Sequence, residues 1–314
     1  MAEKPVLYLT HAACLEHDMG PGHPECPDRL RAIWQALEAP EFAGLMRQQA
    51  PRATPEQLAR AHPAAHVSAI LAIRPEAGEL ARLDADTIMS PGSAEAALRA
   101  AGAGIRAVEA VCRGEARAAF CAVRPPGHHA EPQQPMGFCL FSNVVVAARH
   151  AQAELGVQRV AIIDFDVHHG NGSQACVEAD PSILFISSHQ MPLYPGTGAA
   201  AERGVGNVLN IPLPPGAGGE HFRQAWTAAL PRLSAFGADL VIISAGFDAH
   251  LRDPLAQLRL NEVDFAWITR AIIEAAPGVP VVSMLEGGYD LQALAASTVA
   301  HLRVLCEASQ TGIP

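Results

Sequence analysis

The sequence lacks apolar segments that would hold it in a membrane. No stretch approaches the ~20 consecutive apolar residues that a membrane-spanning helix requires. The first residues, MAEKPVLYLTHAAC, contain an apolar run that is too short for the hydrophobic region of a secretory signal peptide. We therefore expect a cytoplasmic protein with no membrane partner.

Paired cysteines and clustered cations are also missing. The seven cysteines are odd in number and form no C-x-x-C pair, which argues against a disulfide framework and favours a reducing compartment. The 22 lysines and arginines are outnumbered by 32 aspartates and glutamates, giving a formal charge of −10 without a basic cluster. Because phosphate binding depends on clustered cations, we expect no nucleic-acid partner.

Repeats, low-complexity tracts and linkers are absent as well, so nothing in the sequence divides the chain. Its 314 residues are 49% hydrophobic and 17% charged, which is enough apolar material to bury a large core. Because α/β sheets can continue past about 250 residues as one unit, we expect a single domain over residues 1–314. The proline- and glycine-rich stretch 192–218 is expected to form a long loop beside a cleft.

Short β-rich runs alternate with longer helical stretches along the chain. Strands are expected to start at Val6, Ala118, Val160, Ile183, Val208, Leu240 and Val279. Helices are expected over residues 27–37, 64–73, 93–111, 143–155, 219–236, 261–275 and 290–308. Several strand runs are almost wholly apolar, as in parallel strands that are buried on both faces. The alternation predicts an α/β fold, with a parallel β-sheet flanked by helices on both faces.

Polar clusters follow most of these strands at the carboxyl end. They are His11, the pair His128 and His129, residues 164–169, His189, Asp248, and residues 286–289. Open α/β sheets bind ligands outside the carboxyl ends of their strands. These segments are therefore expected to converge on one cleft although they lie far apart in the sequence.

The segment DFDVHHGNG, residues 164–172, combines carboxylate and imidazole side chains in a spacing that suits a metal. In an extended chain, Asp164, Asp166 and His168 lie on the same face. Asp248, from SAGFDAH, completes the three-ligand set of Asp166, His168 and Asp248. Such a set leaves a position open, as in catalytic Zn²⁺ sites, and Fe²⁺ could replace zinc. From spacing alone, the aspartates could instead cap the next helix while the histidines pack in the core.

Two adjacent histidines stand in RPPGHHAEP, residues 124–132, where a strand leads into a loop. Neighbouring side chains on such an exit point in different directions. His128 and His129 therefore need either two separate hydrogen-bond partners or a shared task.

Four motifs, PPGHHA, DFDVHHGNG, SAGFDAH and EGGYD, resemble in this order the zinc-dependent histone deacetylase family. That family also includes bacterial deacetylase-like amidohydrolases and acetylpolyamine amidohydrolases. The resemblance extends from GHPECPDRL, near residue 22, to Tyr289. It implies the arginase/deacetylase fold and a hydrolase that acts on linear amide bonds.

The resemblance implies a role for the metal site and for the histidine pair. The zinc ligands would be Asp166, His168 and Asp248. His128 and His129 would flank the metal-bound water, one as the general base and the other as electrostatic partner or proton donor.

Further residues would support this chemistry if the resemblance holds. Asp164 would orient the first histidine of the pair, and Asn171 the second, as in class II members of the family. Because an amide is uncharged, Asn171 should raise the pKa of His129 less than a carboxylate would. Tyr289 would donate to the oxyanion of the tetrahedral intermediate, although a packed aromatic on a turn is the alternative. Asp164 and Ser187 would also hold a monovalent cation, usually K⁺.

The resemblance also implies a narrow substrate tunnel. Phe138 would form one wall, and Tyr194 the opposite wall, where the family usually has phenylalanine. Either aromatic residue could instead belong to the core. Asp86 would hold the substrate backbone at the rim, unless it caps a helix, and Leu255 would lie at the tunnel mouth. Arg29 would hold product acetate beneath the metal, unless it is an exposed helix arginine.

The leading hypothesis is zinc-dependent removal of acetyl or other acyl groups from lysine-like amides. The runner-up is a deacetylase of acetylated polyamines or other small amines, and a homo-oligomer is compatible with either. A binding module without turnover is disfavoured because the ligands, both histidines and Tyr289 are all present. His11 is expected to be a core or rim residue, whereas His169, His189 and His250 have no assigned task.

Overall fold

Eight parallel strands form the central sheet of the computed structural model, which describes residues 4–307. The strands are β1 (Val6–Thr10), β2 (Met46–Gln49), β5 (Ala118–Cys121), β6 (Val160–Asp164), β7 (Ile183–Gln190), β8 (Val208–Leu213), β9 (Leu240–Ala245) and β10 (Val281–Leu285). They lie in the order β2-β1-β5-β10-β9-β6-β7-β8, and every neighbouring pair is parallel. This arrangement confirms the predicted parallel sheet.

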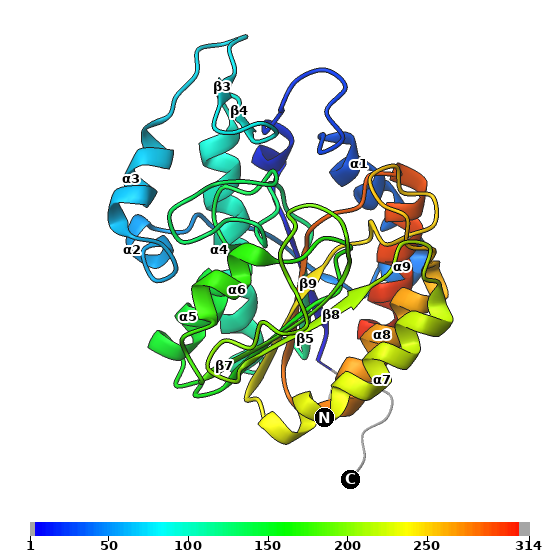
Figure 1. Ribbon diagram of the computed structural model, residues 1–314. Helices are drawn as coiled ribbons and strands as arrows, with labels where there is room; N and C mark the ends of the chain where they lie inside the picture. The colour runs from blue at the N-terminus through cyan, green and yellow to red at the C-terminus, as the bar shows by residue number, and fades with distance from the viewer. Residues whose placement is uncertain (1–3, 308–314) are drawn as a thin grey trace.

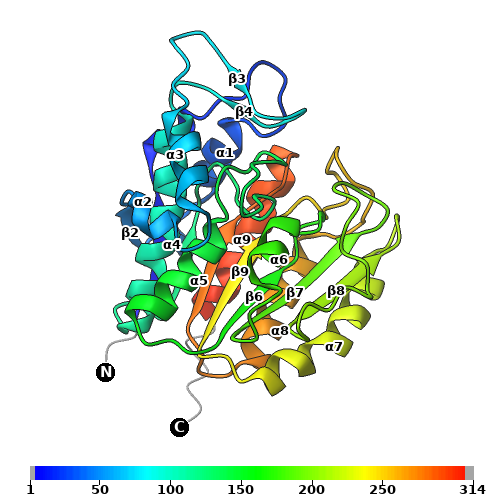
Figure 2. The ribbon, with the colours of Figure 1, turned by 60° about the vertical axis from the view of Figure 1, so that its left-hand side comes forward.

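Helices cover both faces of the sheet, as Figures 1 and 2 show. One face carries α1 (Asp28–Ala36), α7 (Gly219–Phe236), α8 (Glu262–Ala275) and α9 (Leu291–Glu307). The other carries α2 (Pro55–Leu58), α3 (Ala64–Ala72), α4 (Ser93–Cys112), α5 (Asn143–Glu154) and α6 (Asn171–Val177). Outside these layers lie the 3-10 helices η1 (Ala12–Leu15) and η2 (Pro40–Phe42) and the antiparallel pair β3 (Ala81–Arg82) and β4 (Ile88–Met89).

Local sequence explains why these elements begin and end where they do. Every residue of β6, β7, β9 and β10 is buried, because helices cover the sheet on both sides. Helix α8 starts after Asn261, whose side chain accepts from the Val263 amide while the Asp264 carboxylate accepts from the Asn261 amide. Helix α7 ends at Gly237, which has a φ of 63° that favours glycine.

All seven predicted strands and all seven predicted helices are present, with ends that differ by a few residues. The predicted last helix extended to residue 308, which lies outside the described residues. The edge strand β2 was not predicted because its sequence, MRQQ, has no apolar run. Helix α6 was not predicted because seven residues following a glycine-rich turn carry little helical periodicity. Within residues 4–307, no helix has the combined length and apolar character needed to cross a bilayer.

Candidate metal centre and active site

The predicted site segments follow five strands that are neighbours in the sheet. In spatial order, β5 leads to the histidine pair, β10 to residues 286–289, β9 to Asp248, β6 to residues 165–168, and β7 to Tyr194. Because all five strands are parallel, their carboxyl ends lie at one edge. The sheet thus brings together residues that are up to 161 positions apart, from His128 to Tyr289.

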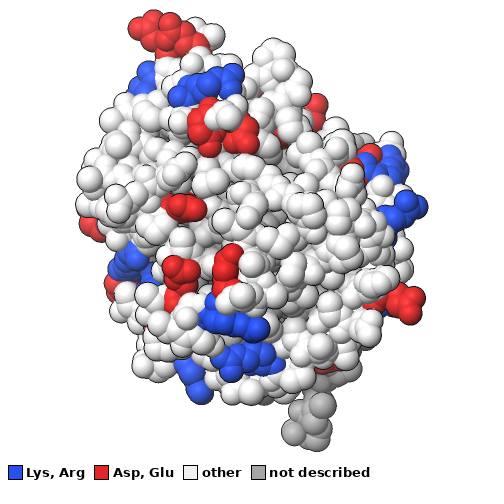
Figure 3. All heavy atoms as spheres, viewed as in Figure 1, with Lys and Arg blue, Asp and Glu red and all other residues white. Residues whose placement is uncertain are grey.

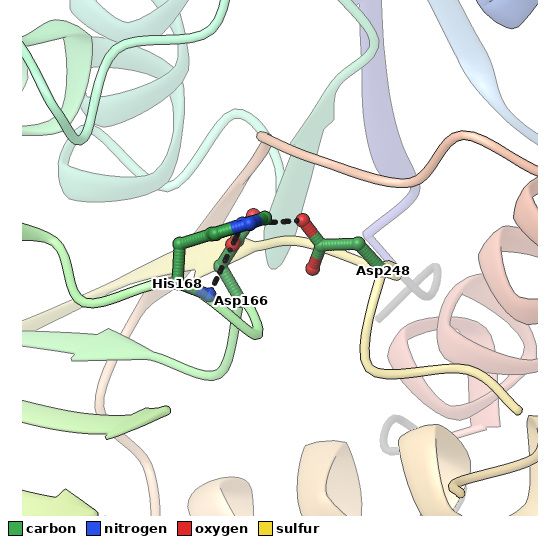
Figure 4. A group of neighbouring side chains, drawn as sticks. All are labelled: Asp166, His168 and Asp248. Carbon is green, nitrogen blue, oxygen red and sulfur yellow. Dashed lines mark hydrogen bonds and ion pairs between the residues drawn. The ribbon is translucent and has the colours of Figure 1, made fainter. Parts of the chain in front are cut away.

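Asp166, His168 and Asp248 form a group that could hold a metal ion. One donor atom of each residue lies within 4.8 Å of the others, and all three side chains are buried. His168 Nδ1 is 3.1 Å from Asp166 Oδ1 and 3.1 Å from Asp248 Oδ2. Figure 4 shows the imidazole and the two carboxylates pointing toward one another from the segments after β6 and β9. The structure therefore gathers the predicted ligand set at one point.

The surroundings of this group fit a divalent cation. Two buried carboxylates face one imidazole, so negative charge exceeds positive charge unless a cation or a proton compensates it. Burial and the neighbouring Asp166 raise the pKa of Asp248 to about 7. Two glycines, which have no side chain, leave room for the carboxylates. A Cβ on Gly246 would lie 2.0 Å from Asp166 Oδ2, and one on Gly287 would lie 2.1 Å from Asp248 Oδ2.

Backbone amides hold the two carboxylates in place. Val167 donates to Asp248 Oδ1 over 2.8 Å, and His168 donates to Asp166 Oδ1 over 2.9 Å. The Gly287 amide donates to Asp166 Oδ2 over 2.8 Å. One nitrogen and two oxygen donors, fixed in this way, are a set that Zn²⁺ accepts at catalytic sites.

The histidine pair lies beside this group, and each ring has a different partner. The two ring centroids are 4.0 Å apart. His128 Nδ1 lies 3.0 Å from Asp164 Oδ2, whereas His129 Nδ1 lies 2.7 Å from Asn171 Oδ1. The Asn171 amide nitrogen in turn donates to Glu131 Oε1 over 2.8 Å. The pair thus has both separate partners and a common position next to the candidate metal centre.

The surroundings of the two rings push their pKa values in opposite directions. Burial lowers the pKa of His128, but the Asp166 and Asp164 carboxylates outweigh burial and raise it well above its usual range. For His129, burial and the nearby imidazoles of His128 and His168 lower the pKa well below its usual range. In the protein without a metal ion, His129 is therefore the neutral member of the pair at neutral pH.

A cavity of about 220 Å³ opens onto this group. Its lining consists of Asp86, His129, Gly137, Phe138, His168, Leu193, Tyr194, Leu255 and Tyr289. All four residues predicted for the tunnel are therefore present at its wall. Tyr194 is 38% exposed, and its ring stands edge-on to the His129 ring with centroids 5.2 Å apart. Phe138 has a φ of 70°, which is uncommon for a residue with a side chain and occurs at strained functional positions.

Tyr289 is held on several sides. Its amide donates to Asp253 Oδ2 over 2.7 Å, and its ring stands edge-on to Phe138 with centroids 5.9 Å apart. The Arg29 guanidinium carbon lies 5.0 Å from the ring centroid. Burial, followed by the negative charge of Asp248, raises the pKa of the Tyr289 phenol well above its usual range. The hydroxyl therefore keeps its proton and can donate it in a hydrogen bond.

Two of the alternatives left open by the sequence are wrong. Arg29 is not an exposed helix arginine, because it is 0% exposed and donates to the carbonyls of Glu286 and Gly288 over 2.5 and 2.6 Å. Asp86 does not cap a helix, because it lies between β3 and β4 and accepts from the Thr87 hydroxyl over 3.2 Å. Both errors arose because burial and loop position depend on distant parts of the chain.

The histidines without an assigned task have structural contacts. His169 Nδ1 lies 2.8 Å from Thr197 Oγ1, and His189 Nε2 lies 2.8 Å from the Gly198 carbonyl. These two side chains anchor the loop that carries Tyr194.

Three other predicted residues also have definite places. His11 is the N-cap of η1 and accepts from the Ala13 amide over 3.0 Å, which is more specific than a core or rim position. His250 Nδ1 accepts from the Arg252 amide over 3.1 Å. Ser187 pairs in register with Asp164, and its hydroxyl lies 3.0 Å from His189 Nδ1.

Asp253 and Glu286 lie next to the site but received no role from the sequence. Asp253 holds the Tyr289 amide, and Glu286 accepts from two backbone amides beside the histidine pair. Burial raises the pKa of Asp253 to about 6 and that of Glu286 to about 7. A carboxylate directly after an apolar strand was the one visible sign of Glu286.

The fold and the site together define a hydrolytic enzyme of the arginase/deacetylase fold, built on the carboxyl edge of a parallel sheet. The chain belongs to the histone deacetylase family, since the family model described as Histone deacetylase domain matches residues 23–305. It is accordingly a deacetylase-family amidohydrolase.

Relatives are similar over most of the chain. An uncharacterized protein of Synechocystis sp. is 43% identical over 306 residues, which cover 96% of this chain and 99% of that protein. The histone deacetylase-like amidohydrolase of Pseudomonas aeruginosa is 41% identical over 278 residues, 85% of this chain and 73% of that protein. The crystal structure of the HDA15 HD domain has a TM-score of 0.91 at 36% identity, covering 97% of this chain and 88% of the other.

Proposed function

We propose that the protein is a zinc-dependent deacetylase that hydrolyses acetyl-lysine-like amides to the free amine and acetate. The observation that carries this proposal is that three groups of side chains lie around the same cavity. The buried Asp–His–Asp set and the histidine pair of unequal pKa each have a member at the wall of one cavity, His168 and His129, and Tyr289 lines the same cavity.

Asp166, His168 and Asp248 would hold the zinc ion, and Fe²⁺ could occupy the same set. When bound, zinc would polarise the amide carbonyl and lower the pKa of a water molecule. Asp164 and Ser187, which are register partners in β6 and β7, would hold a monovalent cation such as K⁺ close by.

His129 would be the general base in the proposed hydrolysis. Its Nδ1 faces Asn171 Oδ1, which can only accept, so the Nδ1 atom carries the proton and Nε2 has a free lone pair. A neutral imidazole in this state can take a proton from water and return it to the departing amine. His128, which pairs with Asp164, supplies positive charge beside the reacting carbonyl.

Tyr289 would stabilise the tetrahedral oxyanion. Its raised pKa keeps the phenol protonated, and a donor fixed in advance costs little reorganisation when negative charge develops. The Arg29 guanidinium beneath the ring is the proposed contact for product acetate.

The cavity favours an extended acyl-amine chain. Phe138 and Tyr194 supply its aromatic lining, while Leu255 contributes apolar contact without charge. In the polyamine-selective members that the sequence resembles, a glutamate at the position of Leu255 meets the distal ammonium. Because a desolvated ammonium without a partner is costly, acetyl-lysine peptides should be better substrates than acetylated polyamines. Acetylated polyamines remain the second candidate, since Asp86 offers a carboxylate at the same cavity.

Turnover of zinc-loaded protein with a substrate panel tests this function. The panel contains acetyl-lysine peptides, longer acyl-lysine peptides and acetylspermidine. We expect the highest kcat/KM on an acyl-lysine peptide. The His129→Ala variant, purified in the same way, controls for contaminating hydrolases. A preference for acetylspermidine would show that acetylated polyamines, not acyl-lysine peptides, are the substrate class. The absence of turnover with any amide would contradict the proposed reaction.

The remaining expectations stay predictions: a cytoplasmic location, no nucleic-acid partner and a homo-oligomer as a compatible state. The face seen in Figure 3 carries small, mixed groups of acidic and basic side chains rather than one continuous basic surface. This distribution agrees with the formal charge of −10 and with a substrate that is not a polyanion.

A further inference from the structure

Glu286 is the first residue after β10, and it is 1% exposed. Its backbone is fixed at both ends of the residue. The amide donates to the Ala245 carbonyl over 3.0 Å, and the carbonyl accepts from Arg29 Nη2 over 2.5 Å. The side chain therefore starts from a rigid point at the centre of the sheet edge.

The Glu286 carboxylate reaches across to the turn that carries the histidine pair. Its Oε2 atom accepts from the Gly127 amide over 2.7 Å and from the His128 amide over 3.1 Å. Its Oε1 atom lies 3.3 Å from the Ser244 hydroxyl, which donates to it. One side chain thus accepts from two successive buried amides, those of Gly127 and His128, at the start of the histidine pair.

The peptide groups of His128 are held from both sides as a result. The amide is bound by Glu286, while the carbonyl accepts from the Ser173 amide at the start of α6 over 3.0 Å. The ring is bound at Nδ1 by Asp164. Among the hydrogen bonds of the described residues, Glu286 is the only side chain that accepts from the Gly127 and His128 amides. Without it, the side of the turn that faces β10 would lose both of these bonds.

We propose that Glu286 is a positioning residue that fixes the Gly127–His128 turn, so that the histidine pair faces the candidate metal centre. It also ties the pair to the segment of Tyr289, because both depend on the end of β10. The inference rests on the proposed hydrolysis for its kinetic consequence, whereas the contact itself is independent of any activity.

The contact needs an acceptor oxygen more than it needs a charge. In Glu286→Gln, the amide oxygen can accept from both backbone groups while the new NH₂ donates to the Ser244 hydroxyl, which is free to reverse its role. In Glu286→Ala, no acceptor is left for the two buried amides. In Glu286→Asp, the carboxylate is one methylene short of them. The three variants therefore separate the acceptor from the charge and from the reach.

Kinetics of these variants with the best acyl-lysine peptide form the first test. We expect Glu286→Ala to lose on the order of 10²-fold in kcat, as for a misplacement of about 1 Å, with zinc content and KM little changed. Glu286→Gln should restore kcat to within about threefold of the wild-type protein, and Glu286→Asp should lie between. Wild-type kcat in Glu286→Ala, or equal losses in the Ala and Gln variants, would overturn the inference.

Asp239→Ala is the matched control. Asp239 Oδ2 also accepts from two successive amides, those of Gln158 and Arg159, over 3.1 and 2.8 Å. It stands before β9, at the opposite edge of the sheet from the site. Its loss should leave kcat and KM unchanged.

Hydrogen exchange measured by mass spectrometry over residues 122–130 is the second test and needs no turnover. Exchange should accelerate in this segment in Glu286→Ala but not in Glu286→Gln or Asp239→Ala. Unchanged protection in Glu286→Ala would overturn the inference even in a fully active enzyme. If the wild-type protein hydrolysed no acyl-lysine peptide, the proposed function would fail while this test still decided the contact. If Glu286→Ala does not fold, Glu286→Asp serves for both tests, and it must show slower turnover and faster exchange than Glu286→Gln.

Discussion

The two adjacent histidines differ in pKa because carboxylates dominate the surroundings of His128, whereas burial and neighbouring imidazoles dominate those of His129. Asp164 places a charged acceptor at His128, whereas Asn171 places a neutral one at His129. A carboxylate stabilises an imidazolium, and an amide oxygen does so far less. The same residue type, repeated in the sequence, can therefore supply a fixed positive charge and a neutral base.

Replacing Asn171 by Asp tests this division of roles. A carboxylate beside Nδ1 should raise the pKa of His129, which is now well below its usual range. A base works in its neutral form, so raising its pKa moves the acidic limb of the pH–rate profile to higher pH. The measurement is kcat/KM against pH for the wild-type and Asn171→Asp proteins. An acidic limb that stays in place would assign the base to another group.

Removing the Tyr289 hydroxyl tests the oxyanion contact. Tyr289→Phe should keep zinc and substrate binding but lose roughly 10²- to 10³-fold in kcat, the usual loss for one oxyanion donor. Tyr194→Phe is the matched control, since it removes a hydroxyl from the same cavity at a partly exposed position. Near-normal kcat in Tyr289→Phe would reduce Tyr289 to a packing residue.

At the scale of elements, the site is assembled from loops, and each of the five neighbouring strands β5, β10, β9, β6 and β7 contributes one. The loop after β7 depends on His169 and His189, whose pKa values burial lowers to about 4, so both remain neutral while they hold the loop. The loop after β9 carries Asp248, Asp253 and Leu255 within eight residues. Under the proposed function, substrate choice would therefore depend on short loops whose ends are fixed by the sheet.

Leu255→Glu tests the contribution of the β9 loop to specificity. The Leu255 amide is bound by Asp253 Oδ1 over 2.9 Å, so a new side chain should start from the same place at the cavity. Hydrogen bonds to charged groups are worth about 1.5–3 kcal/mol, so kcat/KM for acetylspermidine should rise by roughly tenfold or more. Leu255→Gln, similar in size but uncharged, should gain much less. A glutamate variant that gains nothing would show that the ammonium lies elsewhere.

On the scale of the whole molecule, buried charge joins the parts of the chain around the site. Glu25, which is fully buried, accepts from Arg29 Nη1 over 2.9 Å and from Arg124 Nε over 2.5 Å. Burial opposes its ionisation, but the positive charge of Arg124 holds the pKa of Glu25 well below its usual value. The network links the segment before α1 to the ends of β5 and β10. Removing one partner of such a buried pair typically costs about 3–5 kcal/mol, so the site and the stability of the fold are coupled here.

Zinc binding should stabilise the whole protein. Asp248→Ala should abolish both the zinc binding and this stabilisation. Without metal, the folded-state pKa of Asp248 is raised to about 7, so its stabilising contribution is present at acidic pH and is lost as pH rises through about 7. Under the proposed function, zinc would replace that proton, and its binding should strengthen as pH rises toward 7. The rise in Tm on adding zinc should therefore be larger at neutral than at mildly acidic pH.

Calorimetry with and without a chelator measures this shift, and mass spectrometry measures zinc per chain. We expect about one ion per wild-type chain and none in Asp248→Ala. Full zinc occupancy in that variant would remove Asp248 from the ligand set.

Local sequence determined the elements and the chemistry of their ends. Apolar runs of strand length and longer amphipathic stretches are patterns of residues close together in the sequence. Seven of the eight strands of the sheet and seven of the nine α-helices in residues 4–307 could therefore be predicted. The ligand types in DFDVHHGNG and SAGFDAH were equally visible, since donor atoms are a property of the residues themselves.

Tertiary structure alone decided which elements are neighbours and which side chains are buried. The order β5-β10-β9-β6-β7 places five loops together, and no local pattern encodes that order. The burial of Arg29, the position of Asp86 between β3 and β4, and the bond from His128 to Glu286 all join residues distant in sequence. Such contacts form only when the sheet assembles, because they need residues that are far apart in the sequence to come close in space.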